Sequence, residues 1–184
     1  SSGSCADAYQ GNAVLPLTAD KTLLRERIGQ FQASGATGGV GGTSWAWYML
    51  SPKWGSIWTG PAQPGSYADL TAKQASGAPV LRKVAVLMSD GVYNSLRGNK
   101  GQSPADVSNH AKKVCAAMHA QKIEVFTVGF ALDTLPGSDR SVAEDMLKSC
   151  GTDLSHFYST LTVADLKAAF RDIAMKVSPV RLTQ

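Results

Sequence analysis

The sequence contains no apolar run of the roughly 20 residues that a helix needs to span a bilayer, so we expect no membrane span in this chain. Charge is also scarce: 17% of the residues are charged and the formal net charge is +4. The lysines and arginines are scattered rather than clustered among aromatic residues, so nucleic acid is not an expected partner. A hydrophobic content of 43% over 184 residues instead predicts one globular domain spanning residues 1–184.

Cysteine is rare as well. The chain has Cys5, Cys115 and Cys150, and none of them lies in a CxxC pair, so a zinc site is not expected. The odd number leaves two alternatives open. In an oxidising compartment two cysteines pair and the third is left over or pairs with a cysteine absent from this chain. In a reducing compartment all three are buried free thiols.

The sequence motifs of several enzyme classes are missing. There is no GxSxG, and the glycine-rich stretch 35–43 has neither the ending of a P-loop nor a GxGxxG. His110 and His119 lie nine residues apart on one predicted helix, which does not bring them together. His156 has no recognisable partner. We therefore predict that the chain is not an enzyme.

The second half of the chain alternates between strand and helix patterns. Strands are expected at 84–88, 123–130 and 157–159, and the first of these is apolar throughout, as in a strand buried on both faces. Three capping boxes are expected to open the helices, with Ser103, Ser141 and Thr162 as their first residues. This alternation predicts an α/β fold, a mostly parallel, doubly wound (Rossmann-like) sheet with helices on both faces.

The first part of the chain is less regular. Residues 14–17 include Pro16, so if they form a strand it belongs at a sheet edge. Asp20 is expected to cap a helix that runs to about Gln32. Residues 44–50 are predicted to be helical and heavily buried. Residues 51–80, rich in Pro, Gly and Ser, are predicted to form a long excursion from the compact fold.

Two loops carry candidate metal ligands. Ligands of open parallel sheets bind outside the carboxyl ends of the strands, where Asp90 follows the strand at 84–88. Thr37, in the glycine-rich stretch, offers a hydroxyl, and the two oxygens suit a hard cation such as Mg²⁺. The competing interpretations are a plain Asp-Gly turn and an ordinary loop threonine. The residues expected to shape the two loops are Ser89, Gly91, Gly35 and Gly38.

Taken together, Thr37 in its glycine-rich loop, the strand ending in Ser89-Asp90-Gly91 and the strand at 123–130 resemble a von Willebrand factor A (vWA) domain. More narrowly, the chain resembles the C-terminal vWA part of TadG-like proteins of bacterial tight-adherence (Flp) pili. The segments that carry this narrower resemblance are 14–18, 45–52, 90–94 and 166–184. The resemblance spans nearly the whole chain, and its most specific string is Trp-Ala-Trp-Tyr at 45–48, followed by Leu-Ser-Pro at 50–52.

The resemblance implies a metal-ion-dependent adhesion site. In that family Mg²⁺ or Mn²⁺ is bound by a DxSxS motif, a Thr and an Asp, and one position stays open for an acidic group of the partner. Thr37 and Asp90 match the last two, and Ca²⁺ is a further candidate cation. The DxSxS motif is absent, so the first strand, first helix and second strand are expected to be missing. The chain begins at Ser1 without Met, and we expect a trimmed polypeptide that its own missing N-terminal part completes.

The function implied by the resemblance is a non-catalytic adhesion or protein-binding module, extracellular and pilus-associated or periplasmic. Its partner is expected to be a protein with an acidic group, a pilus component or a host or surface ligand. One alternative is a periplasmic assembly scaffold with a vestigial metal site. A less favoured one is a Mg²⁺-dependent enzyme that uses Asp90, for which Lys83 and Lys100 are the nearest lysines.

The resemblance also suggests roles for cysteine and aromatic residues. Cys115 and Cys150 are expected to pair, which leaves Cys5 for an upstream partner. Trp45 and Trp47 are expected in the core. The aromatic residues of the excursion are candidate partner contacts, since exposed loop aromatics make good anchors; they are Trp54, Trp58 and Tyr67.

Overall fold

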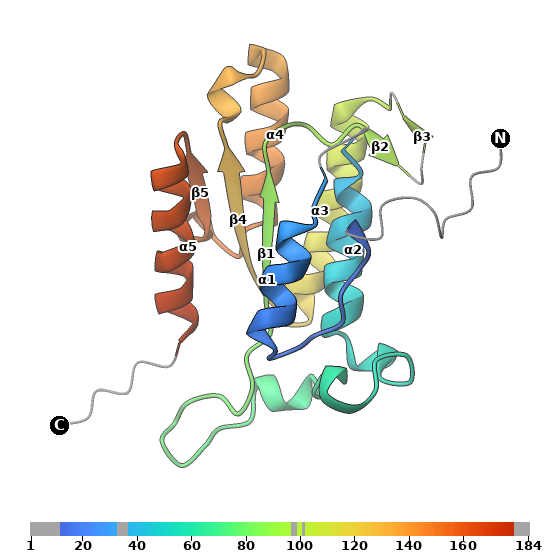
Figure 1. Ribbon diagram of the computed structural model, residues 1–184, viewed down its shortest axis with the longest axis vertical. Coiled ribbons are helices and arrows are strands. Elements are labelled where there is room, and N and C mark those ends of the chain that lie inside the picture. Colours follow the sequence, from blue (N-terminus) through green and yellow to red (C-terminus); the bar gives the residue numbers. More distant parts are fainter. Residues whose placement is uncertain (1–11, 33–36, 97–98, 101, 179–184) are drawn as a thin grey trace.

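The computed structural model describes residues 12–32, 37–96, 99–100 and 102–178. Three parallel strands, in the spatial order β1-β4-β5, form the central sheet (Figure 1). They are β1 (Val84–Ser89), β4 (Glu124–Phe130) and β5 (Phe157–Thr160). The predicted strands are therefore confirmed. A second, two-stranded antiparallel sheet, which the sequence pattern did not suggest, consists of β2 (Ser95–Leu96) and β3 (Asn99–Lys100).

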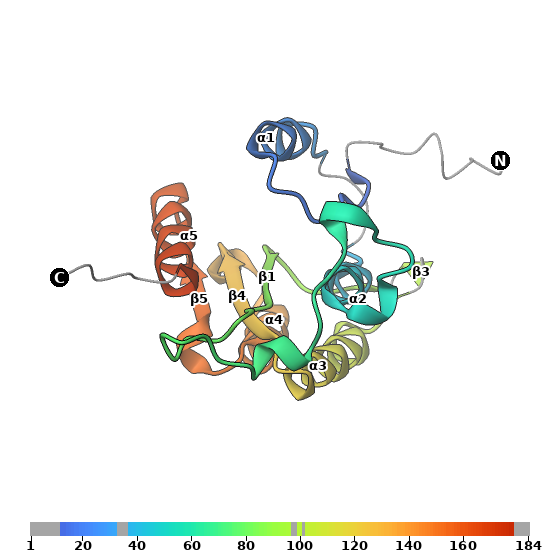
Figure 2. The same ribbon diagram turned by 90° about the horizontal axis from the view of Figure 1, so that it is seen from below.

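Helices flank this sheet on both sides. The α-helices of the described residues are α1 (Lys21–Gly29), α2 (Gly39–Leu50), α3 (Pro104–Ala120), α4 (Gly137–Cys150) and α5 (Val163–Val177). Seen along the strands, α3 and α4 lie on one side of the sheet and α5 on the other (Figure 2). The chain is thus a mixed α/β fold with a parallel sheet, as predicted. In the part of the chain that the structure describes, no helix is both long and apolar enough to cross a membrane.

The face of the sheet that meets α3 and α4 forms the main core. Leu87 of β1 is 7% exposed, and Val125 of β4 packs with Val107 and Leu147 in the same cluster, all three fully buried. A disulfide between Cys115 and Cys150, with the two Cα atoms 5.1 Å apart, joins α3 to the end of α4 within this core. The structure therefore contains the expected disulfide.

The opposite face is covered only in part. Phe126 and Val128 of β4 are buried beneath Ile173 of α5. In β1, however, Val86 is 39% and Met88 54% exposed on this side. The prediction that this strand is buried on both faces is therefore wrong for the described residues. The reason is the position of β1: among the described residues it pairs with β4 alone, and α5 lies over β4 and β5 (Figure 2).

One of the three predicted capping boxes forms. Thr162 accepts from the Asp165 amide and the Asp165 side chain accepts from the Thr162 amide, at the start of α5. Ser103 precedes α3, but its side chain makes no capping bond. Helical bonding in α4 begins earlier than predicted, since the Arg140 amide already donates to the Pro136 carbonyl at 2.9 Å. Ser141 therefore lies inside α4, where its hydroxyl donates to the Gly137 carbonyl instead of capping the helix.

The N-terminal part packs loosely. Asp20 caps α1 as predicted, by accepting from two amides, but the helix ends at Gly29 and has no buried residue. Residues 14–17 form no strand, since Pro16 lacks an amide hydrogen and no described strand lies beside them. In α2 only Val40 and Thr43 are buried, and Trp45 is 40% exposed, so the predicted heavy burial of 44–50 is wrong.

The predicted excursion follows α2. It contains three single turns of 3-10 helix, η2 (Pro52–Trp54), η3 (Gly60–Ala62) and η4 (Ala68–Leu70), before the chain enters β1. Lys83 anchors the end of this excursion. This residue is 4% exposed, and its ammonium donates to the Leu50 carbonyl at 2.7 Å, which ties the start of β1 to the last residue of α2.

Candidate metal-binding loops

The loop that follows β1 presents Asp90 as an exposed residue. Ser89, the last residue of the strand, is 6% exposed. Its hydroxyl donates to the Gly91 carbonyl at 2.8 Å and lies 3.3 Å from the Gly91 amide, from which it accepts. Ser89 therefore closes a tight turn around Asp90, so the carboxylate is carried by a shaped loop and not by a loose connection.

Thr37 is bound directly to this loop, although 57 residues separate it from Asn94. The Thr37 amide donates to Asn94 Oδ1 at 2.9 Å. In return the amides of Asn94 and Ser95 donate to the Thr37 carbonyl at 3.2 and 3.3 Å. The structure thus joins the Thr37 segment to the loop that Asp90 begins, at the carboxyl end of β1.

A second contact fastens the same loop to α2. Tyr93 is 3% exposed, and its ring lies against Gly39, where an added Cβ would come within 2.1 Å of ring atoms. Burial raises the pKa of Tyr93, and a hydrogen bond with the Thr43 side chain partly offsets this. A glycine at position 39 is therefore required for the loop to dock. Gly38 precedes α2 and has open space around it.

The residues present fit a divalent cation only in part. Carboxylate and hydroxyl oxygens are ligands of the type that Mg²⁺ prefers. Among the described residues, however, no group of three or more His, Cys, Asp or Glu gathers that could hold a metal. Gly35, one of the expected loop residues, lies outside the described part. Asp90 and Thr37 carry side-chain oxygens of a suitable kind, and a complete ligand set would need further oxygens.

Two of the aromatic residues predicted to contact a partner pack within the molecule. Trp54 stacks on Tyr48 with ring centroids 4.3 Å apart. Trp58 meets the ring of Trp45 at 6.5 Å. Both tryptophans of the excursion are half-buried in this cluster, and the more exposed apolar side chain beside them is Ile57, at 61%.

Tyr67 is likewise held internally. Its hydroxyl accepts from Trp47 Nε1 at 3.1 Å, and the Lys83 ammonium lies 5.5 Å from its ring centroid. Burial lowers the pKa of Lys83. Lys83 precedes β1 and Asp90 follows it, so a rise of about 3.3 Å per residue separates them by roughly 20 Å. Lys83 therefore does not reach the Asp90 loop, and the side chain of Lys100 lies outside the described residues.

A polar network that sequence reasoning missed lies at the other end of the sheet. His156 faces Asp153 Oδ1 with Nδ1 at 2.8 Å and Glu124 Oε1 with Nε2 at 3.2 Å. Arg82 donates to the second oxygen of Glu124 at 2.5 Å. A hydrogen bond from Ser155, followed by that from His156, lowers the pKa of Asp153 to about 2. The network could have been predicted from the topology, because parallel strands bring the residues at their starts together.

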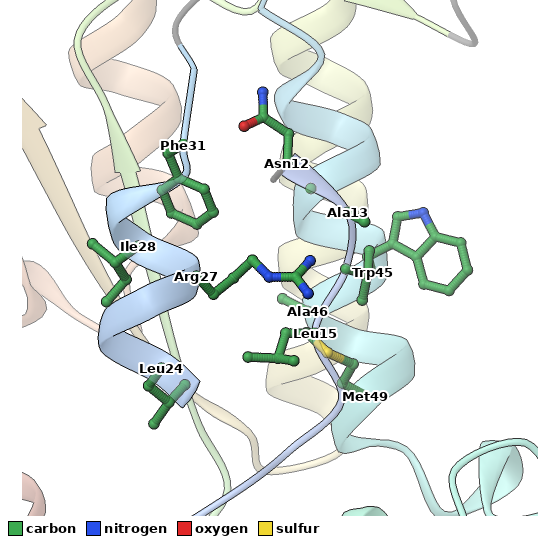
Figure 3. A pocket seen from close by; sticks show the side chains of 12 residues that line it. Asn12, Ala13, Leu15, Leu24, Arg27, Ile28, Phe31, Trp45, Ala46 and Met49 are labelled. Atoms are coloured by element: carbon green, nitrogen blue, oxygen red, sulfur yellow. The ribbon is translucent and has the colours of Figure 1, made fainter. Parts of the chain in front are cut away.

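An apolar groove of about 650 Å³ runs between α1, α2 and the segment at 12–15 (Figure 3). Ile28 and Phe31 on its α1 side are 62% and 61% exposed. Trp45 and Met49 of α2 form the facing wall. The sequence patterns did not predict this groove.

Comparison with known proteins found no relative. No protein-family model, no curated protein and no solved structure matches the chain.

Proposed function

We propose that the chain is a non-catalytic adhesion or protein-binding module of the vWA type, which contacts its partner through a divalent cation. The observation that carries the proposal is the set of hydrogen bonds between Thr37 and residues 94–95. They join a hydroxyl-bearing loop to the loop that begins at Asp90, at the carboxyl end of a parallel strand, where open sheets place their ligands.

In this proposal Asp90 and Thr37 hold Mg²⁺, or Mn²⁺ or Ca²⁺, and the bound cation offers an open position to an acidic group of the partner. The Asp90 carboxylate supplies the negative charge, and Ser89 keeps it exposed by closing the turn with Gly91. The remaining ligands come from a DxSxS segment outside this sequence. Two protein ligands alone would bind Mg²⁺ weakly, because this ion dehydrates reluctantly.

Within the described part of the chain one edge of β1 has no partner strand, which supports the proposal that a missing N-terminal part completes the domain. Residues 84–89 contain neither a charged residue nor a proline, the usual protections of an edge strand. Val86 and Met88 leave apolar surface uncovered beside that edge. A further strand alongside β1 would cover this edge and the exposed side chains beside it. A further helix against the apolar groove between α1 and α2 would bury the side chains that line that groove. On this ground we propose that the sheet is of the vWA type and lacks the first strand, first helix and second strand of that fold.

The buried disulfide supports a location outside the cytoplasm, since such bonds persist in oxidising compartments. We therefore place the protein at the cell surface, associated with pili, or in the periplasm. Its partner is a protein that bears an acidic group, a pilus component or a host or surface ligand.

The test is adhesion of cells that produce the intact protein. The proposal predicts that chelation of divalent cations and Asp90→Ala each abolish adhesion while the amount of displayed protein stays unchanged. Unchanged adhesion in Asp90→Ala cells would refute the metal-bridged contact.

One observation favours a second candidate, a periplasmic pilus-assembly scaffold with a vestigial metal site. Within the described ranges no cluster of three potential charged or sulfur ligands exists. Counting assembled pili separates the two candidates. A scaffold predicts that pili are lost when the protein is deleted but are assembled normally in the Asp90→Ala cells.

A further inference from the structure

Asn94 bonds to Thr37 in both directions. Its side-chain oxygen accepts from the Thr37 amide, and its own amide donates to the Thr37 carbonyl. The amide of Ser95 adds a second bond to that carbonyl. Both polar groups of the Thr37 backbone are therefore committed to the loop that follows β1. The orientation of Thr37 is set from that loop as well as from α2.

Tyr93, the residue before Asn94, also holds the loop against α2. Tyr93 is buried, and its ring lies against Gly39, two residues after Thr37. The loop is thus fixed to the start of α2 by the Tyr93 ring and to Thr37 by Asn94. The two loops are therefore joined by adjacent contacts at Tyr93 and Asn94.

We propose that Asn94 is a positioning residue for the metal: it fixes Thr37 relative to the Asp90 loop, so that hydroxyl and carboxylate form one preorganised half of the site before the cation arrives. This inference rests on the proposed function. Asn94 does not itself coordinate the cation. Residues that orient metal ligands from behind typically contribute 10- to 100-fold to metal affinity. We expect an effect of that size here.

The chain offers a matched control. Asn12 bonds to the backbone of Gln32 through its side chain: its Oδ1 accepts from the Gln32 amide at 2.9 Å and its Nδ2 donates to the Gln32 carbonyl at 2.8 Å. In Asn94 the bond to the Thr37 amide comes from the side chain and the bond to the Thr37 carbonyl from the backbone. Asn12→Leu and Asn94→Leu remove the same kind of side-chain bond at similar side-chain size. Only the second lies at the candidate site. A third variant, Asn94→Asp, keeps an oxygen in place to accept from the Thr37 amide.

The experiment uses the intact protein and two readouts. Without metal, hydrogen exchange of the Thr37 amide should become at least tenfold faster in Asn94→Leu and return towards the original rate in Asn94→Asp. By calorimetry, Mn²⁺ affinity should fall roughly 10- to 100-fold in Asn94→Leu and stay within twofold of the original in Asn12→Leu. Asn94→Asp is not used for the second readout, since its added charge attracts the cation.

Several results would overturn the inference. Unchanged Thr37 exchange in Asn94→Leu shows that Asn94 does not hold Thr37. Faster exchange with unchanged Mn²⁺ affinity shows that the bond positions no ligand. Equal losses of affinity in both leucine variants show a general structural effect. An unsubstituted protein that binds no Mn²⁺ refutes the proposed function itself, and the metal role of Asn94 falls with it.

Discussion

The two ends of the chain differ sharply in how well their apolar side chains are covered. In the C-terminal half, Val107, Val125 and Leu147 are completely buried between the sheet, α3 and α4. In the N-terminal part, α1 buries none of its residues, and Ile28 is 62% exposed. Burial of apolar area is the main favourable term in folding. The C-terminal half therefore has its own core, and α1 lacks a surface to pack against within the described residues.

The same contrast appears within a single strand. Leu87 points into the core and is 7% exposed, whereas its neighbour Met88, on the opposite face, is 54% exposed. Successive side chains of a strand alternate between faces. One face of β1 therefore lies in the core, and the described residues leave the apolar side chains of its other face exposed.

The largest expected effect is loss of the disulfide, which lies wholly within the better-packed half. The double substitution Cys115→Ala with Cys150→Ala should lower the free energy of unfolding by about 2–5 kcal/mol, because it frees a closed loop in the unfolded chain. Urea unfolding measures this, with Cys5→Ala as the control. An unchanged unfolding midpoint in the double variant would contradict the account of this half.

The two faces of β1 provide the next test. In this chain alone, Leu87→Ala should cost about 3 kcal/mol, the range for a buried leucine, and Met88→Ala well under half of that. In the intact protein the cost of Met88→Ala should rise towards that of Leu87→Ala, because the proposed missing segment covers it. Denaturant unfolding of both forms measures the difference. A cost for Met88→Ala that is equally small in both forms would argue against a covering segment.

Gly39 tests the docking of the Asp90 loop on α2. Gly39→Ala places a methyl group where the Tyr93 ring lies, and we expect it to cost about 1–3 kcal/mol through overpacking. Gly41→Ala is the matched control. No atom lies within 4 Å of its added Cβ, and alanine favours a helix interior over glycine by about 1 kcal/mol. Thermal unfolding should therefore shift in opposite directions. Stabilisation by both substitutions would show that the Tyr93 contact does not form.

The smallest expected effect concerns acid stability at the far end of the sheet. The pKa of Asp153 falls from 3.8 to about 2 on folding, first through the Ser155 hydrogen bond and then through His156. A carboxyl with a lowered folded-state pKa stabilises the fold above its unfolded value, and this contribution is lost as pH falls through about 2. Asp153→Asn should therefore flatten the dependence of the urea midpoint on pH between about 4 and 2. Parallel curves for the two proteins would rule out this contribution.

Much of the fold was predictable because its signals are local. In β1 a short run of apolar residues precedes Ser89, and the Thr162 capping box marks α5 within the sequence itself. The capping pattern failed at Ser141 because the Pro136 carbonyl already accepts the first helical bond. The exposure of Met88 was not predictable, since an apolar pattern reports what a strand is suited to bury and not whether a cover is present.

The candidate site was predictable in its residue types and not in its geometry. Asp90 was identified by its place after a buried strand, which is a property of chain order. The bond from Thr37 to Asn94 joins residues 57 positions apart, and no spacing rule pairs an amide side chain with a distant backbone. The His156 network was missed for the same reason, because Glu124 lies 32 residues away from His156, at the start of β4.

The most direct test of the proposed metal site is Mn²⁺ affinity of the intact protein, measured by calorimetry for Asp90→Asn and Asp133→Asn. Asp133 is also exposed and follows β4, at the same end of the sheet, so it controls for a general loss of negative charge. We predict that Asp90→Asn weakens Mn²⁺ binding at least tenfold and that Asp133→Asn leaves it unchanged. Equal affinities in the two variants and the original protein would contradict the assignment of Asp90 as a ligand.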